Sequence, residues 1–134
     1  MFAPHRSHAQ SYSAVQTETG VQGADPHQLI NLLLEGALSA IAAAFSAIER
    51  GDLAAKGRAI SRAVGIVDEG LRGALDLKAG GSVAATLNDL YHCVLLRLTH
   101  ANLHNDGAAL RECSALLTPL RDAWRDIRPQ RLAA

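Results

Sequence analysis

Three histidines come nearest to a metal-binding pattern in this chain. His100 and His104 lie four positions apart, so a helix would place them on one face, and His92 lies two turns earlier. Paired imidazoles at this spacing can hold zinc when a carboxylate or thiolate completes the coordination. No carboxylate or cysteine falls on that face at ligand spacing. We therefore expect a polar helix edge, with no bound metal and no cofactor.

The acidic pairs offer little for catalysis. Asp68-Glu69 and the pair Asp122 and Asp126 lie among arginines, on what the hydrophobic pattern predicts to be surface faces of helices. A general acid or base needs burial or a neighbouring charge to tune its pKa. The chain also lacks a phosphate loop, a dinucleotide-binding fingerprint and a metalloprotease motif. We expect no enzymatic activity.

The composition excludes several kinds of partner. The chain has 134 residues, enough for one domain, and thirteen Lys and Arg balance thirteen Asp and Glu. Without excess charge, electrostatics alone cannot hold nucleic acid or an anionic membrane. Hydrophobic residues reach 49% but aromatics only 4%, which favours helices packed through aliphatic side chains. Unbroken apolar runs are short, and two cysteines, Cys93 and Cys113, form no disulfide framework. We expect a cytosolic all-α protein with no signal peptide and no membrane insertion.

Capping signals divide the chain into an arm, a helical domain and a tail. Residues 1–24 are polar and show no apolar period, so we interpret them as a mobile N-terminal arm. The first strong helix start is Asp25-Pro26, because Asp can cap the free amides and Pro suits the first helical position. The helical domain is predicted over residues 25–127, followed by a frayed tail over residues 128–134.

Four helices are predicted from apolar residues that recur every three or four positions. The first ends at Gly51, Gly80-Gly81 end the second, and Pro119 is expected to kink the fourth. Short connections between helices of matched length predict an antiparallel up-down-up-down four-helix bundle. The expected caps of the second, third and fourth helices are Asp52, Ser82 and Asp106. The predicted core stripes are Ile30, Leu34, Ala37, Ile41, Ala44 and Ile48; Ile60, Val64, Val67, Leu71 and Ala74; Val83, Leu87, Leu90, Val94, Leu98 and Ala101; and Leu110, Cys113, Leu117, Leu120, Trp124 and Ile127.

The first and third helices carry more apolar residues than one core stripe requires. Leu32, Leu33 and Leu34 follow one another, as do Leu95 and Leu96. Successive helical positions point about 100° apart, so these side chains cannot all face one core. A wider buried face, or cover by the arm, would explain the surplus. A groove that accepts an amphipathic helix from a partner would explain it equally well.

The order and spacing of several short motifs resemble the flagellar export chaperones of the FliS type. The resemblance covers residues 12–127. This chain has Leu34-Glu35 where members usually show an aromatic residue and Asp, and Leu96 where they show a second Arg. It also departs from their Tyr-acid-Tyr-Met run, with Tyr91-His92-Cys93-Val94. The matching pieces are Tyr12 to Val21, Asp25 to Ile30, Glu35-Gly36-Ala37, Leu75-Asp76, Gly80-Gly81, Leu87 to Tyr91, Arg97-Leu98, Ala101-Asn102, Asn105-Asp106 and Leu120 to Trp124.

The resemblance implies a function in flagellar protein export. Such chaperones bind the disordered C-terminal segment of flagellin, which becomes helical against their apolar grooves. They prevent premature polymerisation in the cytosol and help to deliver flagellin to the flagellar type III secretion apparatus. The implied partners are this flagellin segment and the cytoplasmic domain of the flagellar export gate. In the family, the N-terminal arm can occupy part of the groove when the client is absent.

A flagellin-binding groove is the site that we predict, in a monomer or weak homodimer. Two alternatives stay open. A self-associating structural bundle would bury the surplus apolar stripe in a homodimer with no client. A metal-binding or enzymatic bundle would need internal carboxylate–histidine pairs, which the sequence lacks. The groove is predicted around Leu29, Leu33, Leu75, Leu77, Leu90, Tyr91, Leu95 and Leu98, with Tyr12 as the anchor of the arm.

Overall fold

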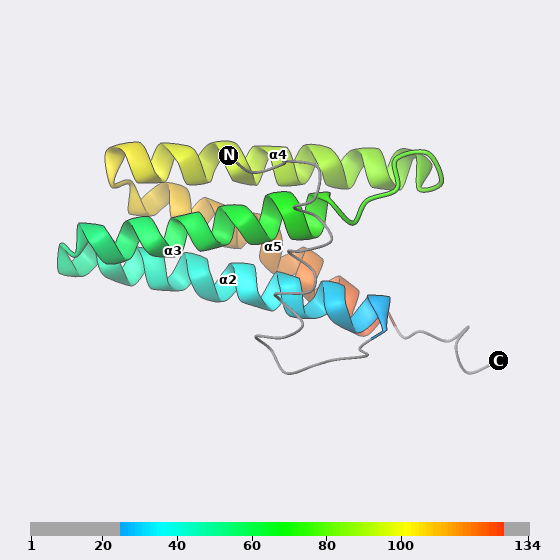
Figure 1. Cartoon of the computed structure of the whole chain (residues 1–134), viewed down its shortest axis with the longest axis horizontal. Helices are drawn as coiled ribbons and strands as arrows, with labels where there is room; N and C mark the ends of the chain where they lie inside the picture. The colour runs from blue at the N-terminus through cyan, green and yellow to red at the C-terminus, as the bar shows by residue number, and fades with distance from the viewer. Residues whose placement is uncertain (1–24, 128–134) are drawn as a thin grey trace, which may run out of the picture.

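The computed structural model describes residues 25–127, and this part of the chain is all-helical, with four helices and no strand. The predicted arm with Tyr12, residues 1–24, and the predicted tail, residues 128–134, lie outside the described range. In Figure 1 each connection reverses the direction of the chain along one long axis. The helices are α2 (Pro26–Arg50), α3 (Leu53–Gly65) continued by the π-helix η2 (Ile66–Arg72), α4 (Gly81–His104) and α5 (Gly107–Asp126).

Aspartate caps begin three of these helices, as the sequence predicts. The Asp25 carboxylate accepts a hydrogen bond from the Gln28 amide at 2.7 Å, and Pro26 occupies the first helical position. Asp52 and Asp106 cap α3 and α5 in the same way. The first helix ends where Gly51 adopts a φ of 73°, a conformation that glycine reaches without steric cost. The local signals therefore set these boundaries correctly.

The second helix departs from the prediction. It was expected to continue to Gly80, but α3 ends at Gly65, the next seven residues form η2, and a connection follows over residues 73–80. Ala74, predicted in the core stripe, is exposed in this connection. The Asp76 side chain accepts hydrogen bonds from the amides of Lys78 and Ala79, which offers this backbone an alternative to helical bonding.

Two further predictions at helix ends are wrong. Ser82 does not cap α4, because the helix begins at Gly81, next to an N-cap at Gly80 that supplies no side-chain hydrogen bond. Val83 in its first turn and Ile127 after α5 are 68% and 51% exposed, so both lie outside the core. End turns reach beyond the neighbouring helices, and a periodic pattern does not reveal how far the neighbours extend.

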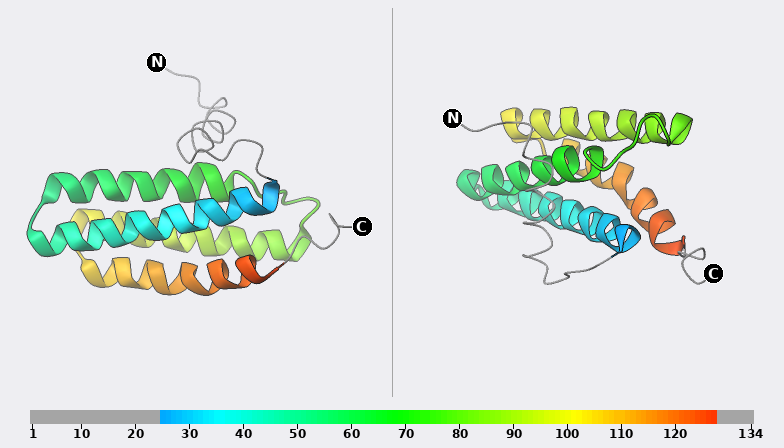
Figure 2. Two further views of the ribbon diagram at one scale, coloured as in Figure 1. Left: turned by 90° about the horizontal axis from the view of Figure 1, so that it is seen from below. Right: turned by 45° about the vertical axis from the view of Figure 1, so that its right-hand side comes forward.

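The core forms where α2 packs against both α3 and α5, an arrangement on which the two views of Figure 2 agree. Its largest fully buried side chains come from all four helices and, apart from Leu33, belong to the predicted stripes. By contrast, α3 and α4 share few contacts. The largest fully buried residues are Leu33, Leu34, Ile41, Val67, Leu71, Val94, Leu98, Leu110, Cys113 and Leu117.

Helix α2 is also apolar enough, by length and composition, to cross a membrane. Its best 18-residue window has a mean hydropathy of 1.7. We expected no such segment because the unbroken apolar runs are short. This expectation is wrong on composition, since the average hydropathy of α2 is high although polar residues interrupt its apolar runs. Core helices of soluble proteins pass the same test. The fully buried Leu34 and Ile41 show that α2 packs as a core helix.

His27 and Trp124 join the beginning of α2 to the end of α5. Their rings stack with centroids 5.3 Å apart, and the Trp124 indole N–H donates to the His27 carbonyl at 3.0 Å. In return, His27 Nε2 donates to the Trp124 carbonyl at 2.7 Å, since a carbonyl oxygen can only accept. One turn further in, Arg121 pairs with Glu35 at 3.0 Å. These contacts close the end of the fold at which residues 25 and 127 lie (Figure 1).

Candidate functional site: an apolar groove between α3 and α4

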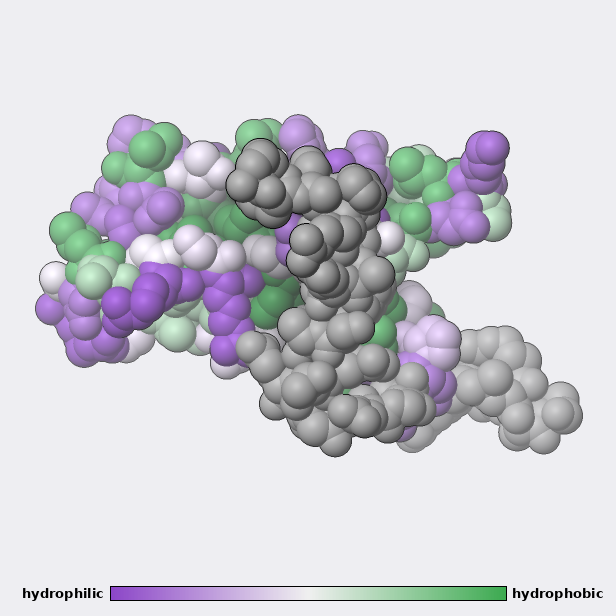
Figure 3. All heavy atoms as spheres, in the orientation of Figure 1, coloured by the Kyte–Doolittle hydropathy of each residue, from purple (hydrophilic) through white to green (hydrophobic). Residues whose placement is uncertain are grey.

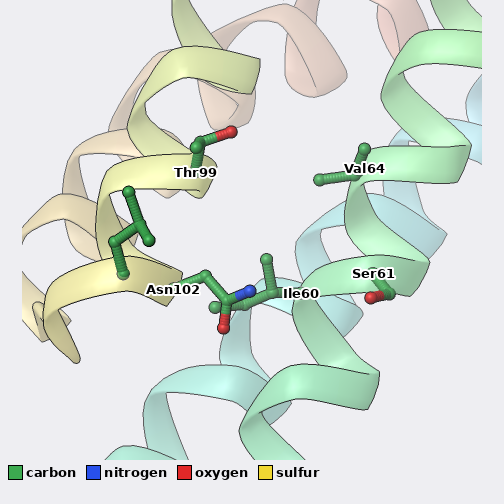
Figure 4. A pocket seen from close by; sticks show the side chains of 6 residues that line it. Ile60, Ser61, Val64, Thr99 and Asn102 are labelled. Carbon is green, nitrogen blue, oxygen red and sulfur yellow. The ribbon is translucent and has the colours of Figure 1, made fainter.

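The sparse contact between α3 and α4 leaves a hollow of about 310 Å³ on the surface. In Figure 4, Val64 and Thr99 lie on opposite sides of this hollow, and Ile60 reaches between the two helices. Figure 3 shows apolar surface between α3 and α4, beside hydrophilic side chains. We call it the α3–α4 groove; its lining residues are Ile60, Ser61 and Val64 from α3, and Thr99, Asn102 and Leu103 from α4.

Apolar side chains line the groove at its floor and on its rim, and the polar residues Ser61, Thr99 and Asn102 complete the lining. Ile60 at the floor is only 2% exposed and belongs to the core, whereas Leu103 on the α4 side is 73% exposed. Leu96 lies two turns before Leu103 on the same helix and is 58% exposed. The Thr99 hydroxyl donates to the Leu95 carbonyl at 3.0 Å, so it needs no partner from a ligand. This surface suits an apolar segment.

Lys56 links the two walls at one end of the groove. Its ammonium donates to the Asn102 carbonyl at 2.9 Å and to the Asn105 side-chain oxygen at 2.6 Å. The residue is only 7% exposed. The Asn102 carbonyl lies in the last turn of α4, at the negative end of the helix dipole, which favours a cation there. We call this contact the Lys56 link.

Arg72, the last residue of η2, makes a second link to α4, beyond the residues that line the groove. Its Nε donates to the Asn88 side-chain oxygen at 3.2 Å, and its Nη1 also contacts Asp68 at 3.3 Å. The lining of the α3–α4 groove, within residues 60–64 of α3 and 99–103 of α4, covers a little more than one turn of each helix.

The structure does not gather the eight predicted groove residues on one exposed surface. Leu33, Tyr91 and Leu98 are buried in the core, and three others are partly buried and pack against it. Leu77 is 55% exposed in the connection between η2 and α4. Tyr12 lies outside the described residues. The three that pack on the core are Leu29, Leu75 and Leu95. Leu90 is also partly buried.

The lining that sequence reasoning missed lies on the groove side of α3 and α4. Ile60 and Val64 were predicted only as core residues, and Leu103 was not singled out. A signal for it exists, because Leu96 and Leu103 share one face of α4, away from the stripe of Val94 and Leu98. What the sequence did not reveal is which neighbouring helix stands back from that face.

The histidines have other partners. His100 Nε2 donates to the Asp106 carboxylate at 3.1 Å, and the rings of His100 and His104 lie 4.6 Å apart. Within residues 25–127, no three His, Cys, Asp or Glu side chains are placed to hold a metal ion. Burial of the Asp106 carboxyl raises its pKa, but hydrogen bonds from the Ala109 and Ala108 amides and from His100 outweigh it, so the pKa lies below its ordinary value.

The two cysteines differ in exposure. Cys113 is fully buried, and its thiol donates to the Val94 carbonyl at 3.7 Å. Burial raises the pKa of this thiol to about 12, so it stays protonated. Cys93 lies on the exposed surface of α4.

An all-helical fold with an apolar groove between two helices is typical of a protein that binds an apolar segment of a partner. Sequence comparison identifies the family: "Flagellar protein FliS" matches residues 8–131, and the chain belongs to this family. The family consists of flagellar secretion chaperones, as the resemblance of the sequence motifs implied.

Curated relatives match along most of the chain. It is 43% identical over 120 residues to the flagellar secretion chaperone FliS of Salmonella typhimurium, covering 90% of this chain and 89% of the relative. The flagellar secretion chaperone FliSB of Pseudomonas aeruginosa is 43% identical over 116 residues, with 87% and 91% covered. The FliS of Bacillus subtilis is 32% identical over 114 residues, with 85% and 83% covered.

Proposed function

We propose that this protein is a cytosolic export chaperone that binds the C-terminal segment of flagellin. Binding prevents premature polymerisation and assists delivery of the client to the flagellar type III secretion apparatus. The cytoplasmic domain of the export gate is the second partner in this proposal. Membership of a family of flagellar secretion chaperones supports it. The α3–α4 groove, with its exposed Leu103, is the structural observation that carries it.

The physical properties of the groove fit such a client. A segment that later packs inside a filament must present an apolar stripe, and the groove offers it the apolar side chains of Ile60, Val64 and Leu103. Ordering a disordered segment costs conformational entropy, so a large area must be buried. We therefore expect the client to extend from the groove over the exposed Leu96.

The proposal assigns the frame and the arm different tasks. The helices, as an antiparallel up-down-up-down bundle, form the rigid frame of the groove. Residues 1–24 act as a mobile arm that competes with the client, with Tyr12 as the anchor. A groove that is free of the arm in only a fraction of molecules binds its client with an affinity reduced by that fraction.

Titration calorimetry with a peptide from the flagellin C-terminus tests the proposal. We expect one-to-one binding with a negative heat-capacity change, because apolar surface is buried. Leu103→Asp places a charge on the groove rim and should weaken binding at least about tenfold. Val83→Asp is the matched control, since Val83 is a similarly exposed residue at the far end of the same helix. Absence of binding, or equal loss in both variants, would contradict the proposal.

Self-association is the competing use of the same apolar surface. Light scattering with and without the peptide separates the two. A chaperone should be a monomer or weak dimer that becomes a one-to-one complex. A stable homodimer whose mass the peptide leaves unchanged would favour the structural bundle without a client.

A further inference from the structure

Lys56 is an unusual residue for the interior of a helical fold. It is the one buried charged residue among the described side chains, and both of its hydrogen-bond acceptors, the Asn102 carbonyl and the Asn105 amide oxygen, are formally neutral. Burying an ammonium group is costly unless hydrogen bonds compensate for lost water. A leucine or methionine would fill the same place at a lower desolvation cost. Packing alone therefore does not explain why a charged residue occupies this position.

The position of Lys56 connects it to the α3–α4 groove. It lies one turn before Ile60, which forms the floor, and it holds the backbone of Asn102, which lines the wall. Since α3 and α4 share few contacts, the Lys56 link is a direct hydrogen-bonded connection between α3 and the end of α4, which also packs against α5. Asn105 adds to it, in a left-handed conformation with a φ of 52°.

We propose that Lys56 is a positioning residue for the groove: it holds α4 at the separation from α3 that receives the client helix. This inference rests on the proposed function. Without the link, the end of α4 samples a range of separations, and the client must first select the productive one. The apparent affinity then falls by the fraction of molecules that have this separation.

Lys56→Met separates positioning from folding. Methionine keeps most of the apolar stem and loses both hydrogen bonds, while Asn102 and Asn105 lie on the exposed surface, where water can satisfy their oxygens. We expect near wild-type thermal stability but a client peptide affinity about tenfold weaker, by calorimetry. Arg58→Met, an exposed position on the same helix, is the matched control and should bind like the wild type.

Asn105→Gly supplies a second variant in case Lys56→Met does not fold. Glycine keeps the left-handed backbone and removes one of the two acceptors. We expect a weakening between the wild type and Lys56→Met.

A covalent replacement of the link distinguishes positioning from general stabilisation. In a Cys93→Ser background, Lys56→Cys with Asn105→Cys can be joined by a short thiol-reactive cross-linker about as long as the lysine side chain. Cys113 stays unreactive, since it is buried and its pKa is raised to about 12. The cross-linked protein should regain most of the lost affinity, and the same variant without the cross-linker should not.

The outcomes are distinguishable. If the wild type binds no flagellin peptide, the proposed function fails, and this inference fails with it. If the wild type binds the peptide, and both Lys56→Met and Asn105→Gly bind it as tightly as the wild type, the positioning role is wrong. The proposed function then still stands. The positioning role is also wrong if the cross-linker does not restore the peptide affinity of the Lys56→Cys, Asn105→Cys variant. The loss of affinity would then have a cause other than the separation of α3 and α4.

Discussion

Asp106 shows how one charged residue supports the end of the fold beside the groove. Its carboxylate accepts hydrogen bonds from the first amides of α5 and from His100. These contacts hold its pKa below the ordinary value of 3.8 despite partial burial. A folded-state pKa below the unfolded value means that the charged form contributes stability above about pH 4. This contribution is lost as the pH falls through the folded-state pKa.

Asp106→Asn should therefore flatten the acid dependence of stability. Asparagine still caps a helix, so the variant removes the charge and keeps the cap. We expect wild-type stability to fall more steeply than that of Asp106→Asn below about pH 4, measured by urea unfolding at successive pH values. Asp126→Asn, at an exposed position at the end of α5, serves as the control. Parallel acid profiles for wild type and Asp106→Asn would contradict the assignment.

At the scale of the element, two glycines differ in the space around them, so replacing each by alanine tests either helix propensity or packing. A Cβ at Gly57 in α3 would meet no atom within 4 Å. At Gly80, before α4, it would lie 2.6 Å from the Ala84 Cβ and 2.8 Å from the Asp76 carbonyl oxygen. Gly57→Ala should stabilise the protein by up to about 1 kcal/mol. Gly80→Ala should destabilise it by about 1–3 kcal/mol, because backbone must move.

Thermal unfolding checks both glycine variants against the wild type. Gly57→Ala should raise the melting temperature by a few degrees, and Gly80→Ala should lower it. A lower melting temperature for Gly57→Ala would show that this side of α3 is not open. An unchanged one for Gly80→Ala would show that the connection over residues 73–80 adapts without cost.

The elements also show how far sequence reasoning reaches. Caps such as Asp25 and Asp52 act within three residues, and the core stripes of α2 and α5 follow helical periodicity, so the sequence predicted both. The switch from α3 to η2 was not predictable in this way. Gly70, in η2, packs so closely that a Cβ would lie 3.0 Å from Leu33 of α2. That contact depends on the tertiary structure and leaves no periodic signal.

The candidate site was harder to predict than the fold for the same reason. The apolar surplus of the third helix was recognised, but its division into buried and exposed members was not. Leu98 lies in the core and Leu96 on the surface, because two helical positions point about 200° apart. Which exposed residues of α4 line a groove depends on the position of α3, a property of the packed helices together. The predicted groove around Leu29, Leu33 and their partners therefore stays a prediction, and the α3–α4 groove is what the structure adds.

At the scale of the whole molecule, the arm gives a prediction with two opposed effects. Deleting residues 1–24 removes the proposed competitor, so the flagellin peptide should bind more tightly in calorimetry. The same deletion leaves apolar surface bare, so light scattering should show more self-association. If both affinity and mass stay unchanged, the arm does not compete for the groove.

The central claim is that the α3–α4 groove holds the C-terminal segment of flagellin. Site-specific photo-cross-linking in the full chain tests it most directly, with the photoreactive residue placed at Leu103 in one variant and at Val83 in another. Both positions are exposed on α4, and only Leu103 lines the groove. We predict a one-to-one cross-link to the flagellin peptide from position 103 and none from position 83. Cross-linking from position 83 with none from position 103 would place the client elsewhere and contradict the claim.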